Sequence, residues 1–285
     1  MRSVGWPAPA KINRFLRITG RREDGYHLLQ TVFQFLDIED LLDFDIRENG
    51  DIRLAVSLDG VTDDDHLCLR AARALQQRTG SEQGAIIHLH KHLPIGGGLG
   101  GGSSDAATVL VALNQLWQTG LSQDELAALG LTLGADVPVF VRGHACWAEG
   151  VGEQITPVSP ATGWLALQTP DVHASTAAVF QDPELKRDST PLKLAPASDL
   201  ETLLEQAGND CEPVVRRRYP RVAEALDGLG LAAGKAFLSG TGASVFALAE
   251  SVEDAADILS RSDRPGRVCR LLNRSPLLTR LEQSE

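Results

Sequence analysis

Residues 94 to 105 read Pro94-Ile95-Gly96-Gly97-Gly98-Leu99-Gly100-Gly101-Gly102-Ser103-Ser104-Asp105. Six glycines within seven residues leave a loop with almost no side chains and with easy access to positive φ angles. Apolar residues then recur with a helical period, at Ala106, Val109, Leu110, Leu113, Leu116 and Trp117. The pattern predicts a glycine loop that runs into a helix, with Ser103 or Ser104 as the residue that caps the helix.

This combination of loop and helix favours the binding of an anion. The first turn of a helix has free backbone N–H groups, and the helix dipole places positive partial charge at the same end. Glycines without side chains allow the backbone to approach the anion closely. We therefore predict a polyphosphate site at residues 94–104.

Other glycine-rich motifs fit this stretch less well. A P-loop ends in Gly-Lys-Ser/Thr, whereas Gly102 is followed by two serines. Gly96, Gly98 and Gly101 match G-x-G-x-x-G, but residues 121–129 read as a helix where a dinucleotide fold needs a second strand. The V-A-I-K and H-R-D motifs of protein kinases do not occur. A flexible linker is disfavoured because amphipathic patterns continue on both sides of the glycines.

The loop resembles the ATP loop of the GHMP small-molecule kinases, which reads Pro-x-Gly-Gly-Gly-Leu-Gly-Gly-Gly-Ser-Ser-x-Ala-Ala. Further blocks follow through most of the chain in that family's order. They are Pro9-Ala10-Lys11-Ile12-Asn13, Arg22-Glu23-Asp24-Gly25-Tyr26-His27, Gly134-Ala135-Asp136-Val137-Pro138-Val139-Phe140 and Leu238-Ser239-Gly240-Thr241-Gly242-Ala243-Ser244. The resemblance implies an α+β, two-domain GHMP-kinase fold with the active site in the cleft between the domains.

The resemblance also implies an activity. More narrowly, the blocks look like those of family members that use ATP, with Mg²⁺, to phosphorylate the 2-hydroxyl of a cytidine diphosphate-linked methylerythritol in non-mevalonate isoprenoid biosynthesis. Asp136 would then be the catalytic base, and Lys11 would supply positive charge beside it. Residues 94–104 would bind ATP. The substrate would contact Asn13, Tyr26, His27, Phe180, Gly240, Thr241 and Gly242.

Each of these residues also has an ordinary structural interpretation. Lys11 could be an exposed lysine, Asp136 the cap of a short helix over 137–142, and Tyr26 a half-buried core residue. Phe180 could equally belong to the core, and Gly240-Thr241-Gly242 could be a plain glycine turn. The activity has alternatives too: another GHMP kinase with a mevalonate, homoserine or sugar acceptor, or a nucleotide-binding module without turnover. The Tyr26-His27 pair favours a nucleobase over an aliphatic acid.

Three groups of residues raise the question of a metal site. Asp63-Asp64-Asp65 precedes a helix predicted over 67–75, so capping and the helix dipole explain these acids. His88, His90 and His92 share one face of a strand over 85–93, but no closing zinc ligand is identifiable. Asp105 could face away from the phosphates or help Ser104 to hold Mg²⁺. The metal ligands therefore stay open.

Composition limits the classes of partner and the cellular compartment that we expect for this chain. The chain has 285 residues and a formal net charge of −11, which argues against a nucleic-acid partner. Its four cysteines show no C-x-x-C pair and read as free thiols. No apolar segment is long enough for a membrane span, and residues 1–10 carry no signal-like apolar region. We expect a cytoplasmic enzyme with small-molecule partners, whose oligomeric state the sequence leaves open.

Glycine and proline between residues 150 and 160 suggest a boundary between an ATP-binding domain over 1–153 and an α+β domain over 154–285. Strands are expected over 6–19 and on both sides of Asn49-Gly50, which predicts a hairpin. In the second domain the pattern predicts a strand over 164–168, helices over 176–180, 213–229 and 251–260, and a last strand over 267–272. That last strand could pack back on the first domain.

Overall fold

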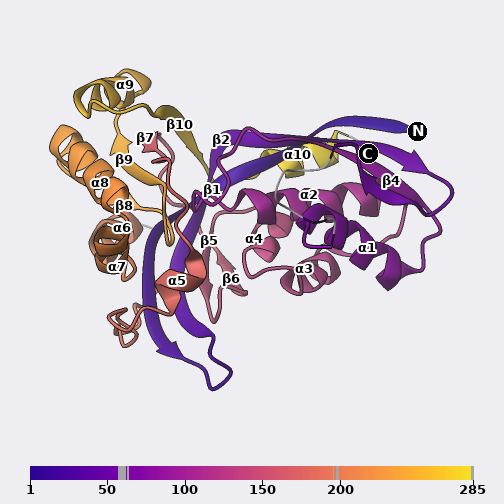
Figure 1. Ribbon diagram of the computed structural model, residues 1–285, viewed down its shortest axis with the longest axis horizontal. Helices are drawn as coiled ribbons and strands as arrows, with labels where there is room; N and C mark the ends of the chain where they lie inside the picture. Colours follow the sequence, from indigo (N-terminus) through magenta and orange to yellow (C-terminus); the bar gives the residue numbers. More distant parts are fainter. Residues whose placement is uncertain (57–61, 63, 195, 197–198, 284–285) are drawn as a thin grey trace.

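A computed structural model describes residues 1–283 except 57–61, 63, 195 and 197–198 (Figure 1). The strands are β1 Arg2–Arg21, β2 His27–Arg47, β3 Ile52–Leu54, β4 Gly84–His90, β5 Cys146–Glu149, β6 Gln154–Pro157, β7 Trp164–Gln168, β8 Phe237–Leu238, β9 Val245–Ala249 and β10 Arg267–Leu272. The helices are α1 Leu67–Thr79, α2 Gly101–Leu116, α3 Gln123–Leu131, α4 Val137–Arg142, α5 Thr176–Phe180, α6 Leu200–Ala207, α7 Glu212–Arg218, α8 Pro220–Ala233, α9 Val252–Arg261 and α10 Pro276–Glu282.

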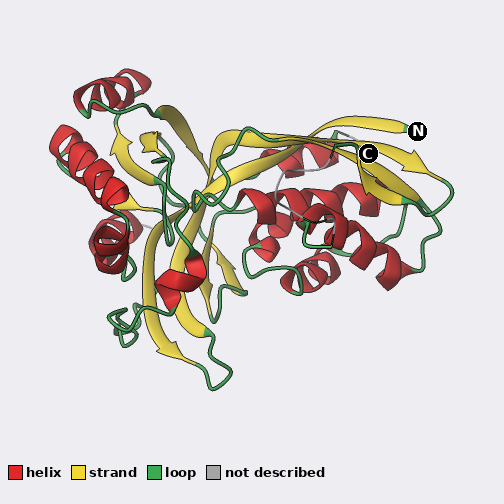
Figure 2. Cartoon of the chain, in the orientation of Figure 1, coloured by secondary structure: helices red, strands yellow, loops and turns green. Residues whose placement is uncertain are grey.

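The long strand β2 organises the sheet. One edge pairs antiparallel with β1 over nearly its whole length. The other edge pairs in turn with β5, β10 and β4. From β10 the sheet continues through β7 and β9 to β8, so one hydrogen-bonded path runs through the described residues from β3 to β8 (Figure 2).

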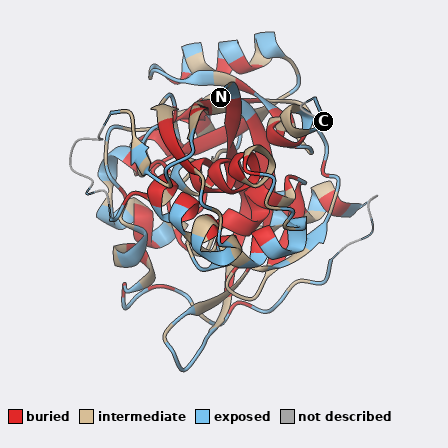
Figure 3. Ribbon diagram, turned by 90° about the vertical axis from the view of Figure 1, so that its right-hand side faces the viewer, coloured by how far each residue is buried: buried red, intermediate tan, exposed pale blue. Residues whose placement is uncertain are grey.

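Helices cover this sheet in two groups. Helices α1 to α4 and α10 lie together at one end of the molecule, and α6 to α9 lie at the other (Figure 1). Each group closes a separate apolar core against its part of the sheet, and the buried residues fill the centre of the view in Figure 3. None of the helices in the described residues is long and apolar enough to cross a membrane. All four cysteines are buried free thiols.

Most expected elements are present, but the prediction of a hairpin at Asn49-Gly50 is wrong. Strand β4 lies between β2 and β3, so the two strands that flank this turn do not pair with each other. The chain still turns at Gly50, where φ is +71°. The Ala85 amide then donates to the Asp51 carbonyl oxygen at 2.9 Å. Strand β4, which comes later in the chain, thus occupies the position beside β2 that the local turn signal predicts for β3.

Two helices also begin differently from the expectation. Helix α2 begins at Gly101, with Gly100 as the N-cap residue at a φ of +72°, and it has no capping side chain. Ser103 and Ser104 therefore lie inside its first turn and do not cap it. Helix α1 is capped by the His66 side chain, which accepts from the Cys68 amide at 3.3 Å, so the aspartates before it do not act as its cap. Asp63 itself lies outside the described residues.

The single helix expected over 213–229 is two helices. Helix α7 ends at Arg218, and α8 begins at Pro220. Tyr219 between them has φ −128° and ψ +80°, an extended conformation of the kind that a following proline favours. Because α7 ends here, Arg217 and Arg218 in its last turn reach the loop that follows α5, where both pair with Asp182. Helix α10 was not expected.

Candidate active site

One pocket of about 890 Å³ contains most of the residues that the sequence analysis selected. Its lining includes Lys11, Asn13, Tyr26, His27, residues 94–103, Asp136, Phe180, Gly240 and Thr241. Ser104 and Gly242 are buried and do not line it. The volume lies in the upper range of small-molecule pockets. The chain thus brings together, in one cavity, segments from its beginning, middle and end.

Lys11 and Asp136 form an ion pair in this pocket, with 3.2 Å between Nζ and Oδ2. Lys11 is buried on β1, where its ammonium also donates to Asn13 Oδ1 at 2.8 Å and lies 5.1 Å from the centre of the Phe33 ring. Asp136 is one-third exposed and precedes α4 without making a capping hydrogen bond. Asp136 therefore presents a carboxylate to the pocket beside a fixed positive charge.

The glycine loop is held by backbone contacts on two sides. On one side, the Lys11 amide of β1 donates to the Leu99 carbonyl oxygen at 2.9 Å. On the other, the Ser244 amide donates to the Gly97 carbonyl oxygen at 2.9 Å, and Ser239 Oγ donates to the Gly98 carbonyl oxygen at 3.1 Å. The turn that contains Gly240-Thr241-Gly242 thus packs directly on the loop.

This packing explains why glycine is needed at positions 98 and 100 of the loop. A Cβ on Gly98 would lie 2.7 Å from the carbonyl oxygens of both Gly242 and Ser239. A Cβ on Gly100 would lie 2.8 Å from the Phe140 ring and 3.0 Å from Lys11 Cε. Both residues also have φ above +70°. Because α2 begins here without a capping side chain, its N-terminal N–H groups remain available to an anion.

An aromatic pair forms another wall of the pocket. The rings of His27 and Phe180 stack with their centres 5.0 Å apart, and the two residues come from β2 and from the end of α5. Tyr26, beside them, is 63% exposed and is therefore not a core tyrosine. Burial, followed by the charges of Arg187 and Arg21, lowers the pKa of His27 below its usual value. These effects favour the neutral form of the His27 imidazole.

Behind the glycine loop lies a buried ion cluster that sequence reasoning missed. Lys91 Nζ donates to Asp40 Oδ2 at 2.5 Å and to Asp105 Oδ2 at 2.9 Å. Asp40 Oδ1 in turn accepts from the Leu93 amide at 2.8 Å. Burial, together with the charge of Asp40, raises the pKa of Asp105 to about 7, although Lys91 opposes this shift. Asp105 faces the ammonium group of Lys91. This contact does not fit the interpretation in which Asp105 helps to hold Mg²⁺.

The strand histidines that raised the question of a zinc site have protein partners. His88 Nε2 lies 2.8 Å from Asp45 Oδ2, and His90 Nε2 lies 3.3 Å from Asp43 Oδ2. In the part of the chain that the structure describes, no group of three or more histidine, cysteine, aspartate or glutamate side chains is arranged to hold a metal ion. His88 and His90 are explained by pairing with acids on the neighbouring strand β2, and His92 Nδ1 lies 3.2 Å from the Glu39 carbonyl oxygen of the same strand.

Arg14 differs from a typical arginine on a strand face, which is exposed to solvent. It is buried on β1, where it donates to Gln34 Oε1 at 2.7 Å and to Glu201 Oε2 at 2.8 Å. The sequence carries one signal of this burial, since Arg14 shares a strand face with aliphatic residues. Its partners come from β2 and α6, so only the folded chain identifies them.

Comparison with known proteins agrees with this geometry. The family model "GHMP kinases N terminal domain" matches residues 66–144, and "GHMP kinases C terminal" matches residues 192–266. A 4-diphosphocytidyl-2-C-methyl-D-erythritol kinase from Shewanella woodyi is 52% identical over 99% of this chain and 98% of its own length. The protein of the same name from Pseudomonas entomophila is 54% identical over 91% of this chain and 89% of its own.

Solved structures extend the similarity to the fold. A crystal structure of 4-(cytidine 5'-diphospho)-2C-methyl-D-erythritol kinase superimposes with a TM-score of 0.77 and 31% identity, over 95% of this chain and 99% of the other. Homoserine kinase from Cytophaga hutchinsonii has a TM-score of 0.70 at 17% identity over 96% and 95%, which shows a shared fold alone. The chain belongs to the GHMP kinases, a family of phosphotransferases, and within it to the family of the 4-diphosphocytidyl-2-C-methyl-D-erythritol kinases.

Proposed function

We propose that the protein transfers the γ-phosphoryl group of ATP to the 2-hydroxyl of 4-diphosphocytidyl-2-C-methyl-D-erythritol, a step of isoprenoid precursor biosynthesis. The observation that carries this proposal is the Lys11–Asp136 pair, 3.2 Å apart, in the same pocket as the glycine loop and the His27–Phe180 stack. The names of the full-length relatives support the choice of acceptor.

Asp136 is the catalytic base in this proposal. Its carboxylate accepts a hydrogen bond from the 2-hydroxyl, orients the oxygen toward the γ-phosphorus and takes the proton as the new P–O bond forms and ADP leaves. Lys11 stabilises the negative charge on the transferring group from a buried and fixed position. Its hydrogen bond to Asn13 holds the ammonium in place, which makes Asn13 a positioning residue.

ATP occupies the other part of the pocket. Its phosphates lie on residues 96–103, against the N-terminus of α2, where backbone N–H groups and the helix dipole favour negative charge. Leu67 and Leu89 also line the pocket and offer apolar contact to the adenine. We propose that Mg²⁺ enters with the nucleotide, bound mainly by phosphate oxygens, as is usual for this ion.

The cytosine of the acceptor binds beside Tyr26, His27 and Phe180. A flat base suits the stacked His27–Phe180 wall, and exposed Tyr26 can cover it from the solvent side. Mevalonate, homoserine and sugars have no aromatic ring to place there. This difference disfavours the other acceptors of the family for this chain.

The test is ADP release by the purified protein with Mg·ATP, run in parallel with the cytidyl substrate, mevalonate, homoserine and galactose. The proposal expects turnover with the cytidyl substrate alone. Turnover with another acceptor would retain the Lys11–Asp136 chemistry but overturn the assigned substrate. Absence of ADP with every acceptor, in a protein that still binds ATP, would favour the nucleotide-binding module.

A further inference from the structure

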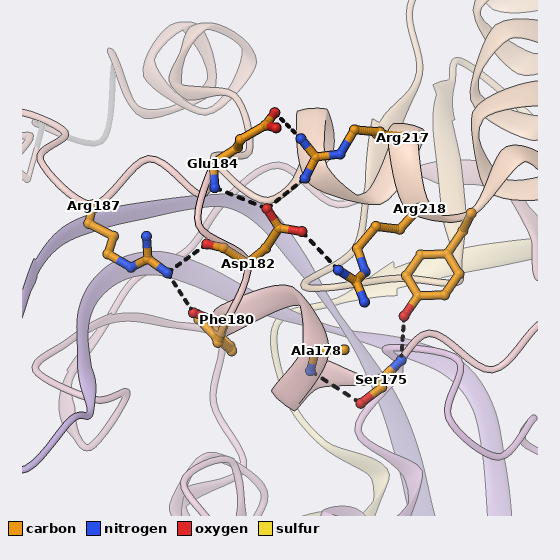
Figure 4. A network of polar contacts seen from close by, with 9 residues as sticks. Ser175, Ala178, Phe180, Asp182, Glu184, Arg187, Arg217 and Arg218 are labelled. Atoms are coloured by element: carbon orange, nitrogen blue, oxygen red, sulfur yellow. Dashed lines mark hydrogen bonds and ion pairs between the residues drawn. The ribbon is translucent and has the colours of Figure 1, made fainter.

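Arg187 lies outside the pocket lining but contacts both members of the stacked pair. Its Nε donates to His27 Nε2 at 3.0 Å, and its terminal Nη2 donates to the Phe180 carbonyl oxygen at 2.9 Å. Figure 4 shows the guanidinium directed at the carbonyl oxygens of Phe180 and Asp182. One side chain from the loop after α5 thus joins His27 of β2 to Phe180 at the end of α5.

The hydrogen bond to His27 determines where the imidazole carries its proton. An arginine Nε–H is always a donor, so His27 Nε2 must accept with its lone pair. A neutral imidazole that accepts at Nε2 carries its proton on Nδ1. Within the described residues, His27 Nδ1 has no hydrogen-bond partner, so this N–H is left to a ligand.

A second contact network holds Arg187's own loop in place. Asp182 is buried, and its two carboxylate oxygens accept from Arg217 at 2.6 Å and from Arg218 at 2.9 Å (Figure 4). Arg217 also pairs with Glu184 on the same loop. The Asp182 carbonyl oxygen accepts from Arg187 at 2.8 Å. The last turn of α7 therefore fixes the loop from which Arg187 reaches His27.

We infer that Arg187 is a positioning residue for the acceptor's base, which fixes His27 in the Nδ1–H tautomer and holds Phe180 over its ring. In that tautomer, His27 can donate to an acceptor atom on the edge of the base, such as O2 or N3 of cytosine. The inference rests on the proposed function, because it gives this wall of the pocket a nucleobase to bind.

The first experiment examines the free enzyme without any substrate. The ¹⁵N spectrum of histidine-labelled protein near pH 7 should show, for His27, a protonated Nδ1 and an unprotonated Nε2, with the signal assigned by its loss in His27→Asn. Arg187→Met should change the tautomer balance of this residue. A wild-type His27 that carries its proton on Nε2 would overturn the inference, whether or not the variant folds.

The second experiment uses steady-state kinetics. Arg187→Met should raise KM for the cytidyl acceptor about tenfold, since a hydrogen bond to a charged group is lost, while KM for ATP stays within about twofold. The matched control is Arg217→Met, the same substitution on the same loop network without contact to His27. It should leave KM for the acceptor nearly unchanged, because Arg218 still holds Asp182 and with it the loop. An equal rise in both variants would mean that Arg187 only stiffens the loop.

A double-substitution cycle completes the test. If Arg187 acts through His27, Arg187→Met should raise KM for the acceptor by clearly less in a His27→Asn background than in wild type, because only its contact with Phe180 is then lost. Additive effects would contradict the inference. Failure of the proposed function is recognised separately, because wild-type protein would then not turn over the cytidyl acceptor at all, while the His27 tautomer would still be measurable.

Discussion

Lys11 and Asp136 come from distant parts of the chain and meet at 3.2 Å in the pocket. Asp136 has the position of a helix cap, but its side chain makes no capping hydrogen bond. Lys11 is buried, although a lysine in isolation is usually exposed. These departures from ordinary behaviour are what a catalytic pair would show, and they support the proposed roles of both residues.

Removal of either charge should stop the chemistry and spare nucleotide binding. We expect Asp136→Asn to lower kcat by about 10²–10⁴-fold, the usual contribution of a general base, and Lys11→Ala to lower it by a similar factor. The dissociation constant of ATP, measured by calorimetry, should change only a few-fold. Turnover at the wild-type rate in either variant would remove that residue from the mechanism.

Asp105 makes the stability of the protein depend on pH. Its pKa in the folded protein is raised to about 7, against an ordinary value of 3.8. The folded state therefore favours the protonated carboxyl. The resulting stabilisation is complete below pH 3.8 and is lost as the pH rises through 7. The pKa of Lys91 is also raised, because its two carboxylate partners outweigh the effect of burial, but this amine titrates above this range.

We predict that Asp105→Asn removes this dependence. The neutral amide resembles the protonated carboxyl, so the unfolding free energy of the variant relative to wild type should rise between pH 5 and pH 8 by roughly 1–4 kcal/mol. Urea unfolding at several pH values measures the difference. Parallel pH profiles for the two proteins would show that Asp105 does not titrate in this range.

The glycine loop depends on both its backbone angles and its close contacts. Gly98→Ala would place a Cβ 2.7 Å from two carbonyl oxygens at a φ of +75°. Gly120 has nearly the same φ, +72°, but a Cβ there would have nothing within 4 Å. The two positions therefore separate the cost of the backbone conformation from the cost of the clash.

We expect Gly120→Ala to lower stability by about 1 kcal/mol and to leave KM for ATP unchanged. Gly98→Ala should lower stability further and raise KM for ATP at least tenfold, because the loop must move to relieve the clash. Thermal unfolding and steady-state kinetics compare the two variants. Equal effects in both would show that the contact with the turn at residues 239–244 is unimportant.

Sequence reasoning succeeded where local chemistry determines the structure. It predicted a helix over residues 121–129, where the structure has α3 at Gln123–Leu131, and it predicted the short helix Val137–Arg142 and the loop that leads into α2. It was wrong at Asn49-Gly50, because the partner of β2 there is β4, whose pairing no local signal reports. It also joined α7 and α8, since the apolar period continues across Pro220.

The same limit applies to the site. Motifs placed Lys11, Asp136 and the glycine loop in one pocket, whose lining is now observed. The contacts that support them were not predictable, because the partners are far apart in the sequence: Lys91 contacts Asp40 of β2, and Arg187 contacts His27 of the same strand. A single sequence carries no record of such pairings between distant residues. Their discovery needs the folded chain.

Strand β10 joins the two groups of helices into one sheet. It pairs with β2 through Leu271 and Leu272, and with β7 through residues 267–270. A shared apolar cluster around it contains Leu36, Leu165 and Leu271, and so includes residues from both proposed domains. We therefore expect the chain to unfold as one cooperative unit.

Leu271→Ala tests this coupling. Leu271 is buried in the shared cluster, and its truncation should lower the unfolding free energy by about 2–5 kcal/mol. The protein should still unfold in a single transition. Tryptophan fluorescence reports mainly on residues 6–147, whereas far-UV circular dichroism reports on the whole chain. The two urea curves should coincide in both proteins. Separate midpoints in the wild type would show that the halves unfold independently.

The central claim is the transfer of phosphate to the 2-hydroxyl, and ³¹P NMR of the product tests it most directly. The carbon that bears this hydroxyl also carries the methyl branch and has no hydrogen of its own. After reaction with Mg·ATP, the account predicts ADP and a new phosphomonoester signal without coupling to a carbinol proton. A doublet or triplet would place the phosphate on another hydroxyl, and no new ester signal would contradict the account.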